Sequence, residues 1–303
     1  MSLKMFVLSV VSVLLLGIAI ANAQGPDGTQ FTSVKAAENI YMLQGNGGNI
    51  GLFTGEDGVF LIDDQFAPLH EKLIAQIKKL SGSADIDLDN AFLINTHFHR
   101  DHTGGNELLG KSGTLIVAHE KGRQRLTTES YVPFFDSRNP AIPKAGLPVI
   151  TFSENMTFHL NGDSVRVVHV GSAHTDGDAF VHFTKANVIH AGDILFLQTY
   201  PFIDLDNGGS VAGVIEGTET LLAISDDRTK IIPGHGNMTD RAGLVSYHKM
   251  LTTTYEAVRQ LVKAGHSLEQ IQSSKPTAEF DGEFEGFVSG EDFVGLLYRD
   301  LTE

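Results

Sequence analysis

Short apolar runs separated by turn residues dominate the chain from residue 39 onward. The first three runs cover 40–43, 49–53 and 59–62, and the turn Gly55-Glu56-Asp57-Gly58 separates the last two. Each run has the length of a strand, and short turns join neighbouring strands in antiparallel order. This part of the pattern therefore predicts an antiparallel opening sheet.

A helical pattern follows over 69–80, where apolar residues recur three or four positions apart until Gly82 ends the pattern. Such a stripe predicts a helix that lies on a sheet. The same reasoning predicts further strands over 91–94, 114–117, 156–160, 164–170, 179–183, 188–191 and 230–232. It predicts further helices over 120–126 and 211–224, a long amphipathic helix after residue 236, and a last helix that a capping box of Ser289 and Asp292 opens.

Strands followed by helices occur twice along the chain. This order predicts two similar halves that pack sheet against sheet with helices outside, in one domain over 39–303. The expected fold class is α/β, in the form of a four-layer αββα sandwich. The Pro-rich connection 133–148 is too long for a plain turn, so we expect it to be a lid or a rim loop.

The first residues have the pattern of an export signal. Lys4 precedes an apolar run over 6–20, and Ala21-Asn22-Ala23 supplies small residues at a cleavage site. The alternative is a retained membrane anchor, but the run is shorter than the roughly 20 residues that a spanning helix needs. We expect a cleavable signal peptide over 1–23, a flexible segment over 24–38, and a periplasmic or secreted protein that no longer contacts the membrane.

Composition and charge limit the chemistry. The chain has 303 residues and no cysteine, so neither disulfides nor thiolate nucleophiles nor thiolate metal ligands are available. Its formal net charge of −15 disfavours nucleic acid as a partner, because a strongly acidic surface repels phosphate backbones. We expect a small-molecule substrate, and the sequence leaves the oligomeric state open.

The segment Thr96-His97-Phe98-His99-Arg100-Asp101-His102 concentrates metal-ligating residue types. His97 and His99 are two positions apart, so in an extended segment both rings point the same way and can bind one ion. Asp101 and His102 offer a carboxylate and a third imidazole for a second ion. Burying these groups together without a cation would cost several kcal/mol, which favours metal over a hydrogen-bonded polar loop.

Three further candidates lie at the ends of predicted strands. They are His174, Asp193 and His235, and glycine adjoins the last two. Since loops at strand ends gather on one rim, we expect these side chains to converge with the histidine segment. Glycine allows the close backbone approach that a crowded metal site needs.

These motifs, in this order, resemble those of the metallo-β-lactamase superfamily over essentially the whole chain from Asn39 to the C-terminal helix. The resemblance implies two metal ions, most simply zinc, although a shell of nitrogen and oxygen would also accept iron or manganese. It assigns His97, His99 and His174 to the first ion. It assigns Asp101, His102 and His235 to the second, with Asp193 bridging the two, at a position where several antibiotic-hydrolysing relatives have cysteine.

The resemblance also implies a reaction, in which a metal-bound hydroxide oriented by Asp101 attacks a carbonyl. β-Lactam (cyclic amide) hydrolysis is the suspected activity. Against it stand Asp193 itself and Phe196, which lies where many relatives have a lysine for the carboxylate of the drug. A lactone or thioester hydrolase on the same site is the first alternative, and a non-catalytic metal-binding protein is the second.

Other polar and aromatic residues receive more ordinary interpretations. Asp63 and Asp64 follow a strand and are expected to cap a turn. Asp176 and Asp178 are left open between turn residues and groups that support His174. Three aromatic residues are candidates for an apolar substrate groove, namely Phe135, Phe196 and Tyr200. The eight remaining histidines are expected to be packing or surface residues, namely His70, His119, His159, His169, His182, His190, His248 and His266.

Overall fold

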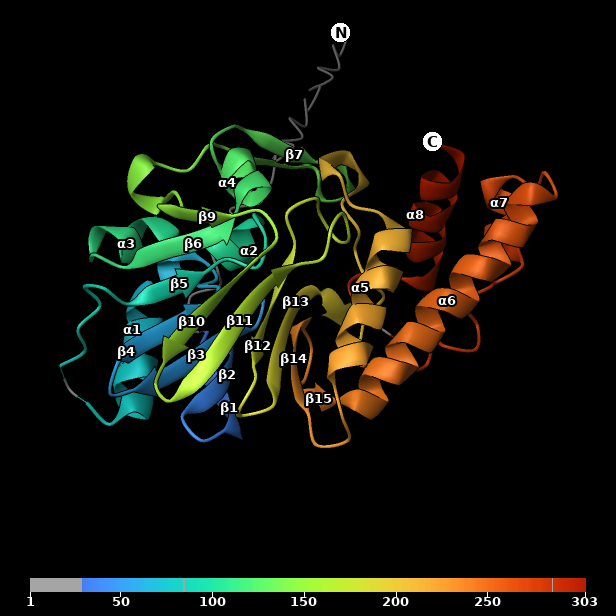
Figure 1. Cartoon of the computed structure of the whole chain (residues 1–303). Helices are drawn as coiled ribbons and strands as arrows, with labels where there is room; N and C mark the ends of the chain where they lie inside the picture. The colour runs from blue at the N-terminus through green and yellow to red at the C-terminus, as the bar shows by residue number, and fades with distance from the viewer. Residues whose placement is uncertain (1–28, 84, 285) are drawn as a thin grey trace, which may run out of the picture.

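Two β-sheets lie face to face at the centre of the fold, and helices cover the outer face of each (Figure 1). The structure is a computed structural model that describes residues 29–83, 85–284 and 286–303. The expected signal peptide over 1–23 lies outside the described residues. The first sheet has the order β1 (Thr32–Ala37), β2 (Ile40–Gln44), β3 (Ile50–Gly55), β4 (Gly58–Ile62), β5 (Phe92–Ile94), β6 (Leu115–His119) and β9 (Ile150–Phe152).

The second sheet has the order β10 (Asn155–Leu160), β11 (Asp163–His169), β12 (Ala179–Phe183), β13 (Val188–Phe196), β14 (Lys230–His235) and β15 (Thr239–Asp240). Strands β4, β5, β6 and β9 run parallel, and so do β13 and β14. The carboxyl ends of neighbouring parallel strands meet at one edge of each sheet, which is where ligands bind in such sheets.

The helices divide between the two outer faces. Helix α1 (His70–Ser81) packs on the first sheet through Leu73 and Ile77, and it ends at Gly82 as expected. Helices α5 (Val211–Ile224) and α6 (Arg241–Lys263) pack on the second sheet, and α8 (Gly290–Thr302) packs on α6. The shorter helices are α2 (Arg100–Thr103), α3 (Asn106–Lys111), α4 (Glu120–Leu126) and α7 (Leu268–Ser273).

Three apolar cores separate these layers. One lies between helix α1 and the first sheet, one between the sheets, and one between the second sheet and its helices. Phe60 and Phe183 face each other across the middle core, with ring centroids 6.3 Å apart. The predicted four-layer αββα sandwich is therefore confirmed.

Two expectations about local structure were wrong. Residues 32–37, expected within the flexible segment 24–38, form edge strand β1, which pairs antiparallel with β2. Its side chains are mostly exposed, so backbone hydrogen bonds hold it and no apolar pattern marks it. The strand expected over 188–191 continues to Phe196.

The connection 133–148, expected to be a lid or a rim loop, carries regular structure. It contains the short helix Pro133–Phe135, strand β8 (Ser137–Asn139) and the short helix Lys144–Gly146. Strand β8 pairs antiparallel with β7 (Ser130–Val132) as a small ribbon. Separately, none of the helices in the described part of the chain has the length and hydropathy that crossing a membrane requires.

Candidate metal centre

All seven predicted ligands converge where the strands of both sheets end. His97 and His99 lie in the segment between β5 and α2, and Asp101 and His102 lie on α2 itself. The other three come from the second sheet: His174 from the β11–β12 connection, Asp193 from β13, and His235 from the end of β14. Their potential ligand atoms form three groups that share members, and within each group the ligand atoms lie within 4.8 Å of one another. One of these groups, His97, His102 and Asp193, links the other two.

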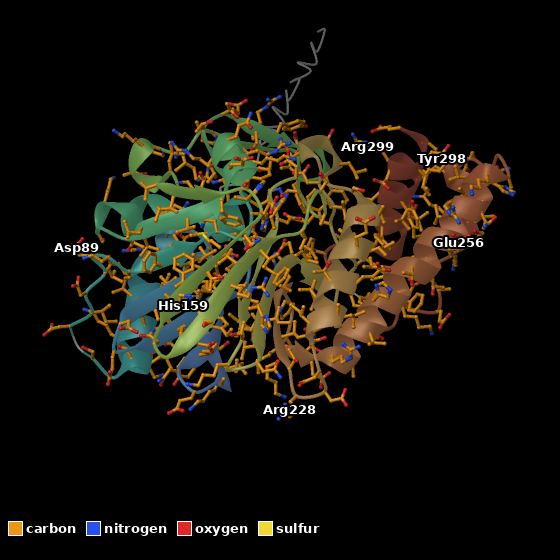
Figure 2. The ribbon with its side chains drawn as sticks, in the orientation of Figure 1. Asp89, His159, Arg228, Glu256, Tyr298 and Arg299 are labelled. Carbon is orange, nitrogen blue, oxygen red and sulfur yellow. The ribbon has the colours of Figure 1, made fainter. Side chains whose placement is uncertain are left out.

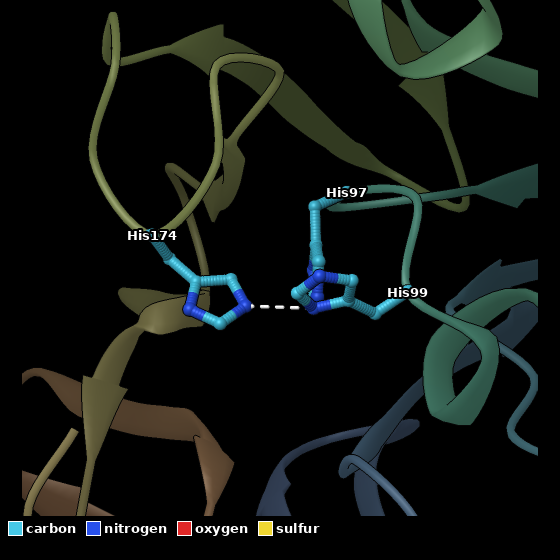
Figure 3. A group of neighbouring side chains, drawn as sticks. All are labelled: His97, His99 and His174. Atoms are coloured by element: carbon cyan, nitrogen blue, oxygen red, sulfur yellow. Dashed lines mark hydrogen bonds between the residues drawn. The ribbon is translucent and has the colours of Figure 1, made fainter. Parts of the chain in front are cut away.

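The first group is His97, His99 and His174 (Figure 3). Nδ1 of His99 lies 2.9 Å from Nε2 of His174. The opposite nitrogen of each ring lies beside an oxygen acceptor: Nε2 of His99 is 2.9 Å from Asp204 Oδ2, and Nδ1 of His174 is 2.8 Å from the carbonyl oxygen of Phe202. Because those oxygens accept, the ring protons belong to these outer nitrogens, and two lone pairs face each other inside the cluster.

The second group is Asp101, His102 and His235. Oδ2 of Asp101 lies 3.2 Å from Nε2 of His235 and 3.5 Å from Nε2 of His102. The two Nε2 atoms are 3.4 Å apart. These three side chains thus present one carboxylate and two imidazole nitrogens toward a common point.

Asp193 lies between the two groups. Its Oδ2 is 3.4 Å from His174 Nε2 and 3.5 Å from His235 Nε2, while its Oδ1 is 3.2 Å from His102 Nε2. One carboxylate therefore contacts members of both trios, which is the geometry of a bridging ligand.

Two glycines make room for this carboxylate. Gly192 has a φ of 54° within a register shift of β13, and this bulge turns the strand immediately before Asp193. A Cβ atom on Gly234 would lie 1.9 Å from Asp193 Oδ1, so no larger residue fits there without moving the carboxylate. The glycines that adjoin Asp193 and His235 in the sequence thus serve the close approach that we expected.

The protonation states suit a cation. Burial, and then the positive charge of nearby imidazoles, lowers the pKa of His97 well below its usual value. Burial outweighs the nearby carboxylates and lowers the pKa of His174 to about 4. Nε2 of His97 and Oδ1 of Asp193 are buried and have no hydrogen-bond partner among the described residues. A metal ion would satisfy these lone pairs, and the donor set of imidazole and carboxylate fits zinc, iron or manganese.

Asp193 and the second group shift one another's pKa values. Burial would raise the pKa of Asp193, but the imidazoles of His102 and His235 outweigh it and hold this pKa well below its usual range. For His235, burial is outweighed by Asp193 and Asp101, which raise its pKa to about 9. Protons and metal ions therefore compete for this group.

Two carboxylates that the sequence reasoning missed orient the histidines. Asp63, expected to cap a turn, is fully buried, and its Oδ2 lies 2.7 Å from Nδ1 of His102. It also accepts hydrogen bonds from the backbone and hydroxyl of Thr96, at 2.8 and 2.7 Å. Asp204 contacts His99 in a similar way, with its Oδ2 2.9 Å from Nε2 of that ring. Such carboxylates fix the tautomer of a ligating histidine and raise its basicity.

A signal for Asp63 was present in the sequence. It follows β4 directly, as the histidine segment follows β5, and these strands are parallel neighbours. Asp204 had no comparable signal, because it reaches His99 from a loop more than 100 positions away.

A cavity of about 400 Å³ opens over the cluster. Aromatic side chains from distant segments form much of its wall: Phe66, Phe135, Phe196, Phe202 and Phe287. Phe135 and Phe287 are about half exposed, at 48% and 52%, and their ring centroids are 6.2 Å apart. Phe135 and Phe196 line this cavity, whereas Tyr200 is buried in the core, where its hydroxyl donates to Asp281 at 2.9 Å.

The remaining polar residues fall outside the cluster. Asp176 forms an ion pair with Arg125, and Asp178 accepts from the backbone nitrogen of Thr175 at 2.9 Å. None of the eight other histidines belongs to a metal-capable group in the described ranges. His159, for example, lies exposed on β10 (Figure 2).

Comparison with known proteins agrees with this geometry. The sequence profile of the metallo-beta-lactamase superfamily matches residues 43–235. A probable metallo-hydrolase of Methanocaldococcus jannaschii is 28% identical over 223 residues, which is 71% of this chain and 94% of that protein.

Solved structures share the fold. A metallo-beta-lactamase from Pontibacter korlensis aligns with a TM-score of 0.57 and 17% identity, covering 74% of this chain and 99% of that one. A sec-alkylsulfatase from Pseudomonas sp. aligns with a TM-score of 0.66 and 14% identity, covering 90% of this chain and 50% of that one.

Proposed function

The chain belongs to the metallo-β-lactamase superfamily of hydrolases, and we propose that it opens β-lactam rings with two zinc ions held by the seven converging side chains. Asp193 contacts members of both ligand groups at the floor of an open cavity, and this observation carries the two-metal part of the proposal. The export leader pattern supports a β-lactam substrate, because such drugs act outside the cytoplasm. Bound divalent cations lower the pKa of water and act as Lewis acids toward a carbonyl group. Iron or manganese would suit the same donors.

The residues around the cations divide the remaining work. Asp101 is the proposed catalytic residue, because its carboxylate lines the cavity and is 29% exposed. Burial would raise its pKa, but His102 and His235 outweigh burial and lower it. Asp101 is therefore an ionised acceptor that can orient an attacking water.

The aromatic wall suits a small substrate with an apolar group. Phe196 stacks on His235 with ring centroids 5.1 Å apart and an interplanar angle of 11°. Phe202, Phe134 and Phe135 make further ring contacts along the rim. These rings would pack against the side chain of an acylated substrate and exclude water from the bond that is cleaved.

A lactone or thioester is the second candidate substrate. The half-exposed Phe135 and Phe287 favour it, because exposed apolar surface at a cavity mouth fits a long acyl chain. The cluster would act on either carbonyl, so only the leaving group distinguishes the two activities.

A substrate panel decides between them. We would compare kcat/KM for a chromogenic cephalosporin, a long-chain homoserine lactone and an acyl thioester on the metal-loaded protein, with Asp101→Asn as the control for catalysis at this site. The proposal expects turnover of the cephalosporin that falls in Asp101→Asn by roughly 100-fold or more. Turnover of an ester without any turnover of the cephalosporin would replace the lactam proposal with the second candidate. Bound metal without turnover of any of the three would favour a non-catalytic metal-binding protein.

We also propose that the protein is periplasmic or secreted, with the leader pattern of residues 1–23 as support. The acidic net charge supports a small-molecule substrate over nucleic acid. Mass spectrometry of the exported protein tests the first point, since cleavage after Ala23 gives a mature chain that begins at Gln24. A full-length chain retained in the cytoplasm would contradict it.

A further inference from the structure

Arg100 lies between two predicted ligands, His99 and Asp101, at the start of α2. It lines the cavity over the metal cluster, and among the described residues of that wall it alone is a lysine or arginine. We propose that Arg100 forms an anion-binding subsite beside the cluster and that the substrate carries a carboxylate. This inference rests on the proposed function, because it takes the cavity to be the substrate site.

Among the described residues, no carboxylate pairs with the guanidinium of Arg100. Its Nε atom is buried and has no hydrogen-bond partner in the part of the chain that the structure describes. An N–H donor that is shielded from water and lacks an acceptor is unfavourable, so an acceptor from outside the chain would complement it.

The charged neighbours of Arg100 are already engaged elsewhere. Asp101 is adjacent in sequence, but its Oδ2 faces His235 at 3.2 Å. Arg100 also lines a smaller cavity of about 160 Å³, together with Glu107 and Arg125. Glu107 pairs with Lys111 at 2.6 Å, and Arg125 pairs with Asp176 at 2.8 Å. The positive charge of Arg100 thus remains available to a ligand.

The location of this charge defines the kind of ligand. Arg100 and the aromatic residues Phe135 and Phe287 line the same cavity, so the ligand combines an anionic group with an apolar one. A guanidinium can hold a carboxylate through two parallel hydrogen bonds, which fixes orientation as well as charge. In a chain of net charge −15, Arg100 would also offset part of the general repulsion of anions.

The test compares two unreactive probes of nearly the same shape. Isothermal titration calorimetry would measure the binding of 4-phenylbutyrate and of its neutral amide, 4-phenylbutanamide, to the metal-loaded protein and to Arg100→Met. The ratio of the two affinities is the readout, because metal ions that bind the carboxylate are present in both proteins. We expect Arg100→Met to weaken carboxylate binding roughly tenfold or more, the loss of a charge-assisted hydrogen bond, and to leave amide binding unchanged.

Arg138→Met is the matched control. Arg138 lies on β8 at the same rim and pairs with Glu129 at 3.4 Å, but it does not line the cavity. Arg138→Met should keep the affinity ratio of the parent protein. An unchanged ratio in Arg100→Met, or equal weakening of both probes, would overturn the proposal. Because neither probe is hydrolysed, a protein that shows the expected ratio yet turns over no substrate would refute the proposed function and leave the subsite standing.

Discussion

At the scale of single residues, the candidate centre depends on the candidate ligands and equally on the carboxylates that orient their imidazole rings. The carboxylate of Asp63 contacts Nδ1 of His102 at 2.7 Å and also accepts from Thr96. It thereby leaves Nε2 of His102 free to face the cluster.

We expect Asp63→Asn to weaken metal binding roughly 10- to 100-fold, because an amide neither fixes the imidazole tautomer as a carboxylate does nor raises its basicity. Competition titration with a chromophoric chelator measures this. Asp64→Asn is the matched control, since Asp64 is equally buried but accepts only from the backbone of Gly105. Equal metal affinity in both variants would exclude a supporting role for Asp63.

Gly234→Ala should disturb the bridging carboxylate. Its new Cβ would lie 1.9 Å from Asp193 Oδ1, so Asp193 must move away from the histidines. We expect roughly a tenfold or greater loss of metal affinity and a matching loss of turnover. Gly282→Ala meets no atom within 4 Å and serves as the control. Normal metal content in Gly234→Ala would show that Asp193 is not a ligand.

The candidate ligands were predictable from the sequence, whereas of their two supporting carboxylates only Asp63 had a signal there, its place directly after a strand. His97, His99, Asp101 and His102 lie within six positions, so local geometry alone brings them together. Asp63 and Asp204 act through contacts with residues far along the chain, and spacing rules do not report such contacts. Only the parallel pairing of β4 and β5 shows that Asp63 ends beside the histidine segment.

At the scale of elements, apolar periodicity and the known signals for helix ends predicted the helices α1 and α8 correctly. Helix α1 ends at Gly82 in a left-handed conformation, and helix α8 begins with the expected capping box of Ser289 and Asp292. Strand β1 was missed because its burial is slight. The extension of β13 was missed because Gly192 interrupts an otherwise apolar run with a bulge.

The cap of α8 gives a prediction for stability apart from function. Ser289→Ala removes the side chain that accepts from the backbone nitrogen of Asp292 at 3.1 Å. Loss of such a cap costs about 1 kcal/mol, which urea unfolding would detect as a lower midpoint. Metal content should stay unchanged, because α8 packs on α6 and not on the cluster. A loss of metal in this variant would mean that α8 supports the centre.

At the scale of the whole molecule, one buried acid should shape the dependence of stability on pH. Burial raises the pKa of Asp178 to about 7, although hydrogen bonds from Thr175 oppose the shift. Between the usual value of 3.8 and about 7, the folded protein holds a proton that the unfolded chain has released. This contribution therefore makes the free energy of unfolding fall as the pH rises through that window.

Asp178→Asn has no such proton. Urea unfolding at pH 5 and at pH 8 gives the free energy of unfolding of both proteins. The value for Asp178→Asn minus the value for the parent protein should be larger at pH 8 than at pH 5 by at least about 1 kcal/mol. Parallel pH dependence in the two proteins would mean that Asp178 is ionised in the folded state throughout.

The four-layer architecture makes the central claim possible, because its two sheets bring the seven candidate ligands together from four separate segments of the chain. Metal analysis of the purified protein tests that claim most directly. Plasma mass spectrometry on protein prepared without chelators should find roughly two divalent ions per chain, and His102→Ala should lose at least one of them. A value near zero in the parent protein, with the fold intact by circular dichroism, would contradict the account.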